Sequence, residues 1–235
     1  MFTPTRTMAE WVSFRDHLLS WVSMGTCIAQ YPWCDTPDIT LANGQVWAAC
    51  NVGASIAGIW AESYGSSFQW WRNHPFPTTG PVPTITWPIP PSMLIAADIA
   101  NQFITSMDYD WLSVPDANRW WGADLTTTYQ AASSSNQSLM QGPCSAGYHI
   151  PTNTEIQSSL DLLWSSWLWV LIAPLSEFRN TDASLSVNEP HWYGYWWTSS
   201  PFSWGWNIMY WDISDAYSPA GTYRTIAVPI RCLRN

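Results

Sequence analysis

The stretch that decides the fold is Tyr195–Asn235, which reads YWWTSSPFSWGWNIMYWDISDAYSPAGTYRTIAVPIRCLRN. Residues 207–214 alternate with a period of two, as the side chains of a β-strand do. Met209, Trp211 and Ile213 point to one face and are apolar, whereas Ile208, Tyr210, Asp212 and Ser214 point to the other and are mixed. The pattern predicts one face on the core and one face that displays mixed chemistry. Because tyrosine supplies contact area at low entropic cost, we expect a binding protein.

The charge balance narrows the range of partners. The 235 residues include 8 basic and 17 acidic side chains, which gives a formal net charge of −9, and there is no lysine. An acidic chain without basic clusters argues against nucleic acid and against anionic membranes. The 20 tryptophans are far above ordinary usage. They suit either a tryptophan-rich core or a recognition surface.

The first part of the chain predicts one helix and one extended segment. Residues 5–22 have the apolar spacing of an amphipathic helix. Residues 75–91 are proline-rich and predict an extended surface segment. No linker is long enough to separate two domains. We therefore expect a single domain over residues 1–235, with residues 1–42 as a helical segment packed on it.

A second helix is predicted after a short strand at Tyr148–Pro151. Thr152 and Glu155 have the spacing of a capping box, and the helix is expected to run towards Trp164. The region from Trp196 onward predicts two or three strands, because Gly205, Pro219 and Gly221 interrupt it and mark strand ends. Together these patterns predict an α+β protein.

Metal and membrane signals are weak. The five cysteines leave at least one without an intramolecular partner, and they are Cys27, Cys34, Cys50, Cys144 and Cys232. The sequence has no CxxC and its histidines are scattered, so we expect no zinc site. The first residues lack a basic region followed by an apolar run, so no signal peptide is visible. No stretch reaches transmembrane length.

Six blocks carry a resemblance to a known family and occur in the family's order. They are NGQVWAACNVGAS (43–55), YGSSFQWWRN (64–73), NRWWGADL (118–125), NQSLMQGPCSAGYHIPTNTEI (136–156), PLSEFRNTDASL (174–185) and YWWTSSP…VPIRCLRN (195–235). With these blocks the chain resembles the bacterial variable proteins of diversity-generating retroelements. The resemblance implies a C-type lectin-like fold of the formylglycine-generating-enzyme type. Such a fold has a small twisted antiparallel sheet, two flanking helices and extensive loops.

The resemblance also implies which residues vary. In this family an error-prone reverse transcriptase rewrites adenine-containing codons, here within the region 195–235. The implied hypervariable, ligand-binding positions are Phe202, Ser203, Ile208, Tyr210, Asp212, Ser214, Ala216, Tyr217, Thr222, Tyr223 and Thr225. The implied fixed scaffold beneath them is Trp204, Trp206, Met209 and Trp211. Cys144 and Cys232 lie in the matching part of the chain and are expected to form a disulfide or to be buried thiols.

The chain departs from the family pattern at a few positions. Relatives usually have glycine where this chain has Trp71, and they usually have an aromatic residue where it has Ile156. They also run Asp-Gly-Ser-Leu where this chain has Asp182-Ala183-Ser184-Leu185. A glycine that needs positive φ cannot be replaced without strain. Trp71 is therefore expected to mark either a rearranged loop or a codon that the source organism reads differently.

No catalytic residue is predicted. The family's namesake oxidises a cysteine, which needs a reactive or metal-binding cysteine pair, and Cys144 and Cys232 lie instead beside expected structural strands. Calcium-dependent sugar binding is not expected, because Glu189-Pro190-His191 and Trp206-Asn207-Ile208 each lack one oxygen ligand. A structural calcium remains an alternative at the acidic residues Asp108, Asp110 and Asp116.

The resulting hypothesis is non-catalytic recognition of a protein or cell-surface ligand, with no cofactor and no nucleic acid. The resemblance favours the cell surface or the extracellular space. Two alternatives stay open: a fixed-specificity adhesin or phage-type receptor-binding module on the same fold, and an oxidoreductase like the formylglycine-generating enzyme.

Overall fold

The computed structural model describes residues 34–58, 61–70, 72–86, 101–107, 141–163, 170–176, 178–186, 193–202, 205–212 and 217–235. At residues 61, 201–202, 205–207, 212 and 217–219 the description covers the backbone alone. Several sequence-based predictions lie outside these residues. They are the helix over 5–22, the loop at Trp71, the candidate calcium residues Asp108, Asp110 and Asp116, and the positions Ser203, Trp204, Ile213, Ser214 and Ala216.

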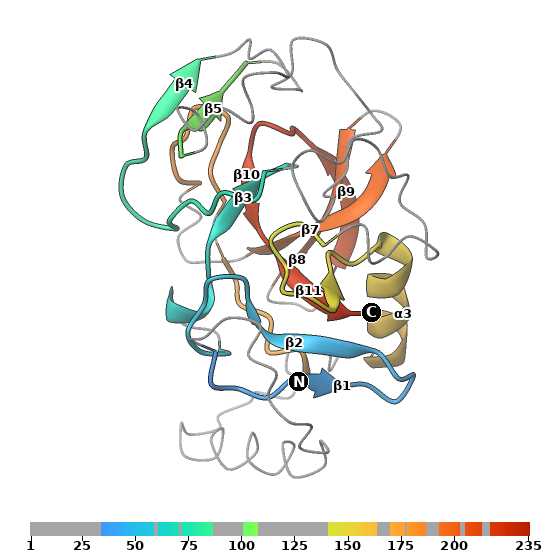
Figure 1. Ribbon diagram of the computed structural model, residues 1–235. Helices are drawn as coiled ribbons and strands as arrows, with labels where there is room; N and C mark the ends of the chain where they lie inside the picture. The colour runs from blue at the N-terminus through green and yellow to red at the C-terminus, as the bar shows by residue number, and fades with distance from the viewer. Residues whose placement is uncertain are drawn as a thin grey trace, which may run out of the picture.

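The described residues are mostly strands, with one α-helix, and the strands form four small sheets (Figure 1). The amino-terminal elements are β1 (Ile39–Thr40), β2 (Val46–Asn51), η1 (Ala61–Ser63), β3 (Ser67–Gln69), β4 (Thr84–Thr86) and β5 (Phe103–Thr105). After them come β6 (Tyr148–His149), α3 (Asn153–Leu163), β7 (Tyr193–Phe202), β8 (Gly205–Asp212), β9 (Tyr217–Thr222), β10 (Ala227–Pro229) and β11 (Arg231–Arg234). Mixed α and β content was expected, but the 193–234 region holds five strands rather than two or three.

The strands pair over long sequence distances. One sheet has the order β1-β2-β11-β6 and another is the three-stranded meander β7-β8-β9. β10 pairs with β3 in an antiparallel register, and β4 pairs with β5 in parallel. The carboxy-terminal strands β10 and β11 therefore pair with β3 and β2, which both lie in the first third of the chain. The sequence does not indicate these partners, because strand pairing at such separations leaves no local pattern.

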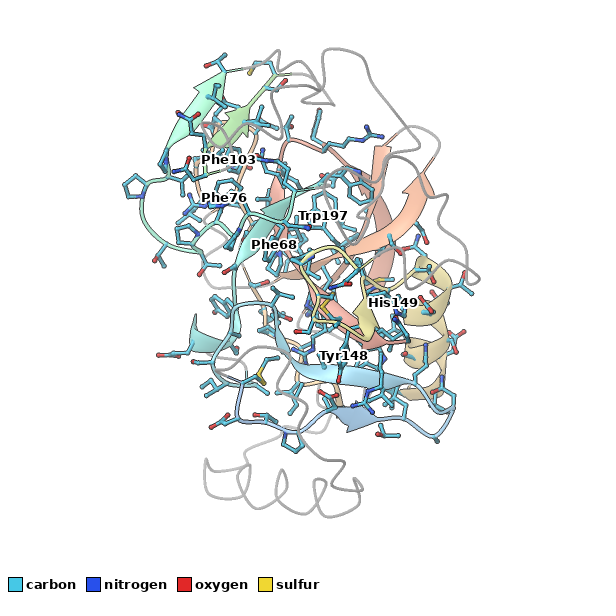
Figure 2. The ribbon with its side chains drawn as sticks, viewed as in Figure 1. Phe68, Phe76, Phe103, Tyr148, His149 and Trp197 are labelled. Carbon is cyan, nitrogen blue, oxygen red and sulfur yellow. A yellow bond between two sulfur atoms is a disulfide. The ribbon has the colours of Figure 1, made fainter. Side chains whose placement is uncertain are left out.

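The predicted helix is present as α3, and its capping box is the reason that it begins where it does. Glu155 N–H donates to Thr152 Oγ1 (3.2 Å), and Thr152 N–H donates back to the Glu155 carboxylate (2.8 Å). The same carboxylate lies 3.2 Å from Nε2 of His149, a fully buried side chain beside α3 (Figure 2). Ile156 and Leu160 face the core.

We expect this cap to weaken in acid. Burial alone would raise the pKa of Glu155, but hydrogen bonds from His149 and Thr152 outweigh it and hold that pKa below its usual value. Because the folded pKa is the lower one, the stabilisation is present above the unfolded pKa and is lost as pH falls through the folded pKa. Urea midpoints measured from about pH 7 to about pH 3 should therefore fall less steeply for Glu155→Gln than for the parent. Equal slopes would contradict this assignment.

Two disulfides fasten the described part of the chain. Cys144 is joined to Cys232 across 88 residues, and Cys34 is joined to Cys50 across 16. Of the two alternatives left open for Cys144 and Cys232, the structure has the disulfide. The Cys34–Cys50 bridge was not predicted. It ties the segment before β1 to strand β2.

Ala183 adopts a left-handed conformation, with φ of 69°. Its carbonyl accepts a hydrogen bond from Nη1 of Arg179 (2.9 Å), whose guanidinium also donates to the carbonyls of Pro77 and Gly80. An alanine in this conformation costs about 1–2 kcal/mol of backbone strain, which a glycine at the same position would avoid. Ala183 occupies the position at which the resemblance expects glycine.

Candidate functional site

A layer of buried tryptophans supports the β7-β8-β9 sheet. The ring of Trp196 lies 4.5 Å from that of Trp211 and 5.9 Å from that of Trp47, centroid to centroid. Met209 and Trp211 are both buried in this cluster, as the period-two pattern predicted for that face. Trp211 lies directly over Gly194, where a Cβ would overlap the indole ring. The close packing fixes the backbone of β7 against that of β8.

The buried side chain of Arg231 connects this tryptophan layer to the β1-β2-β11-β6 sheet. Arg231 is fully buried, and burial lowers its pKa to about 9. Its guanidinium carbon lies 5.5 Å from the Trp196 ring centre, its Nη1 donates to Asn51 Oδ1 (3.2 Å), and its Nη2 donates to the Leu171 carbonyl. The indole N–H of Trp196 donates to the same Asn51 oxygen (2.9 Å). The cation is thus held by an aromatic face and by neutral oxygens.

The opposite face of the sheet is also covered at Ile208, and a second predicted display position, Thr225, is buried beyond the end of β9. Ile208 is 6% exposed and packs in the cluster that contains Trp197 and Val228. Thr225 is 0% exposed, and its carbonyl accepts a hydrogen bond from Gln69 Nε2 (2.8 Å). Tyr210 is half-buried against the same cluster. Ile208 and Thr225 are therefore core residues and are not displayed.

The sequence does contain a signal for this second covered face. Trp196 and Trp197 are consecutive, and a strand directs consecutive side chains to opposite faces. Both are fully buried, with the Trp197 indole N–H donating to the Phe68 carbonyl of β3 (2.6 Å; Figure 2). Two adjacent large aromatics in a strand thus indicate that both of its faces are buried.

The strand register divides the remaining candidate positions between the two ends of the sheet. Phe202 pairs with Gly205 and Trp206 pairs with Thr222 at one end, where Tyr223 follows and is 39% exposed. At the other end, Asp212 pairs with Tyr193 and Tyr217 pairs with Trp211. The eight residues of β8 separate these ends by about 25 Å. Backbone pairing alone thus places the candidates in two groups.

A groove lies between α3 and strand β8. It is open to solvent and has a volume of about 510 Å³, and its lining residues are Asn153, Thr154, Gln157, Ser158, Asp161 and Met209. α3 lies beside the β7-β8-β9 sheet (Figure 1), and Asn153 N–H donates to Ser200 Oγ of β7 (2.8 Å). Of these lining residues, the sequence analysis names only Met209, and it predicts that Met209 is part of the fixed scaffold. The outward polar stripe of α3 was the signal that could have indicated the groove.

Within the ranges given above, no three His, Cys, Asp or Glu side chains gather as ligands for a metal ion. None of the helical residues described there forms a helix long and apolar enough to cross a membrane.

Comparison of the chain with models of known protein families, with curated proteins and with solved structures finds no match.

Proposed function

We propose that the protein is a non-catalytic recognition protein, with a C-type lectin-like fold, of the kind encoded by diversity-generating retroelements. It binds a protein or cell-surface ligand through the ends of the β7-β8-β9 sheet and the segments that join its strands. The observation that carries the proposal is the buried layer of Trp196, Met209 and Trp211 beneath those strands. A fixed layer of this kind lets exposed side chains change without moving the backbone that presents them.

The burial pattern refines the proposed contact residues. Thr222 is half-buried and Tyr223 exposed, next to the β7–β8 connection that contains Ser203. Ser214, Ala216 and Tyr217 belong to the other group, around the β8–β9 connection. Residues in strand connections contribute little to the core, so they tolerate exchange. Ile208 and Thr225 are left out of the contact set because they are buried.

Two further features support the family assignment. Ala183 has positive φ at the position where the resemblance expects glycine, so the backbone geometry expected of the family fits this turn. The Cys144–Cys232 disulfide links two of the six matching blocks and suits an oxidising compartment. That compartment agrees with recognition at a cell surface.

The coding DNA provides the test. We expect the DNA that flanks the gene to contain a near-repeat of the segment that encodes residues 195–235. The two copies should differ at adenine positions, and a reverse-transcriptase gene should lie nearby. Finding neither would reject the retroelement assignment and favour a fixed-specificity adhesin on the same scaffold.

A further inference from the structure

We propose that the end of the β7-β8-β9 sheet at which β7 begins binds a basic segment of a protein ligand, by stacking arginine side chains on exposed tyrosine rings. The proposal rests on the proposed recognition function, which makes this end of the sheet a binding end. It adds the chemistry of the partner and names tyrosines that the sequence analysis did not single out.

The side chains on one face of β7 become more exposed towards the start of the strand. Trp197 is 0% exposed, Tyr195 is half-buried, and Tyr193 is 40% exposed. These three residues alternate along a regular stretch of pairing with β8, so they share one face of the sheet. The cover that buries Trp197 and Ile208 therefore ends before Tyr193, and aromatic surface is in contact with solvent there.

Two further aromatic rings adjoin this exposed end. Tyr210 pairs with Tyr195 across the strands and is also half-buried. The ring of Phe178 packs edge-on against the ring of Tyr195, with 5.0 Å between their centres. We call Phe178, Tyr193, Tyr195 and Tyr210 the aromatic patch. Because Tyr195 is already packed, the patch presents ring surface that needs little ordering when a ligand binds.

The charges around the aromatic patch select a cationic partner. Between Arg179 and Arg224 the sequence has no lysine or arginine, and it has four acidic residues, Asp182, Glu189, Asp212 and Asp215. Both bounding arginines are 1% exposed, so they present little charge to solvent. Asp212 pairs with Tyr193 in the strand register, which places an acidic residue beside the patch. An anionic ligand would also be repelled by the net charge of −9.

Arginine is the cationic side chain that suits this surface best. Its planar guanidinium stacks on the faces of aromatic rings and also pairs with carboxylates. The lysine ammonium is a compact, strongly hydrated charge and stacks less well. An uncharged segment would use the rings but would gain nothing from the acidic residues. We therefore expect the affinity of the patch to depend on both the charge and the planar shape of arginine.

The test uses the full chain and three peptides of equal length. The peptide Gly-Arg-Gly-Arg-Gly-Arg is titrated into protein with isotope-labelled tyrosine rings, and its citrulline and lysine counterparts are titrated in parallel. Citrulline keeps nearly the shape of arginine but carries no charge. The arginine peptide should shift the Tyr193 ring resonances in a saturable manner. It should bind about tenfold more tightly than the citrulline peptide and about threefold more tightly than the lysine peptide. No saturable shift at Tyr193, or equal affinity for the arginine peptide and either counterpart, would overturn the proposal.

Substitutions at the patch localise the effect. Tyr193→Leu removes the exposed ring and should weaken binding of the arginine peptide about fivefold, whereas Tyr193→Phe keeps the ring and should change binding less than about twofold. The control is Leu162→Ala, at a position on α3 that is 42% exposed and outside the patch, and it should also change binding less than about twofold. Asp212→Asn removes the paired charge and should weaken binding about threefold, which gives a second variant if Tyr193→Leu does not fold. Unchanged binding in folded Tyr193→Leu, or in Asp212→Asn, would refute the site.

The flanking-DNA test is independent of these measurements. A patch that binds no arginine peptide would remove the assigned partner and leave the retroelement assignment intact. A missing template repeat would reject the retroelement assignment, whereas saturable binding at Tyr193 would still establish the patch.

Discussion

Replacing Cys144 and Cys232 together by alanine should lower the free energy of unfolding by about 4–5 kcal/mol. Their disulfide closes a loop of 88 residues, which strongly restricts the unfolded chain. Both sulfurs are buried, so the replacement also removes packed atoms. Paired replacement avoids leaving one reactive thiol in the core.

The second disulfide provides a matched control for this prediction. Cys34 and Cys50 close a loop of only 16 residues, for which the same chain-entropy estimate is about 3 kcal/mol. Urea unfolding of both double variants under non-reducing conditions measures the difference. A smaller loss for the Cys144–Cys232 pair than for the Cys34–Cys50 pair would show that loop entropy does not govern either bridge.

Gly194→Ala should cost about 3 kcal/mol, the upper part of the range for overpacking a core. A methyl group at this position overlaps Cε2, Cζ2 and Nε1 of Trp211. The ring cannot move away easily, because it is 0% exposed and packs against Trp196. Thermal or urea unfolding of the single variant gives the cost.

A double-mutant cycle shows whether the tryptophan ring is the cause. Trp211→Ala alone should cost about 3–5 kcal/mol, because it empties a buried site. In that background the ring is absent, so Gly194→Ala should cost less than about 1 kcal/mol, which gives a coupling of about 2 kcal/mol. If Gly194→Ala costs the same in both backgrounds, the close contact does not determine the stability of the β7–β8 pair.

Local patterns were enough to predict the elements that depend on neighbouring residues. The Thr152–Glu155 capping box indicated where α3 begins, and alternation placed Met209 and Trp211 on a buried face. Both features follow from residues at most a few positions apart. Helix capping and strand periodicity are properties of local backbone geometry.

Features that depend on long-range packing could not be predicted in the same way. Alternation shows which residues of a strand share a face, but it does not show whether another element packs on that face. Ile208 is therefore predicted at the surface, whereas the structure places it in the core. The cover comes from β3 and β10, which pair across the sequence. The groove arises only where α3 is placed beside Met209. Its position is a tertiary property, although its polar stripe is visible in the sequence.

The most direct test of the proposed recognition function is to sequence the coding region for residues 195–235 from many individual members of the source population. We expect amino-acid changes to concentrate at exposed and connecting positions such as Ser203, Ser214 and Tyr223. Trp196, Met209 and Trp211 should be invariant, and Ile208 should change only to other apolar residues. Changes spread evenly over the region, or as frequent at Met209 and Trp211 as at Tyr223, would contradict a fixed tryptophan layer that supports exchangeable contact residues.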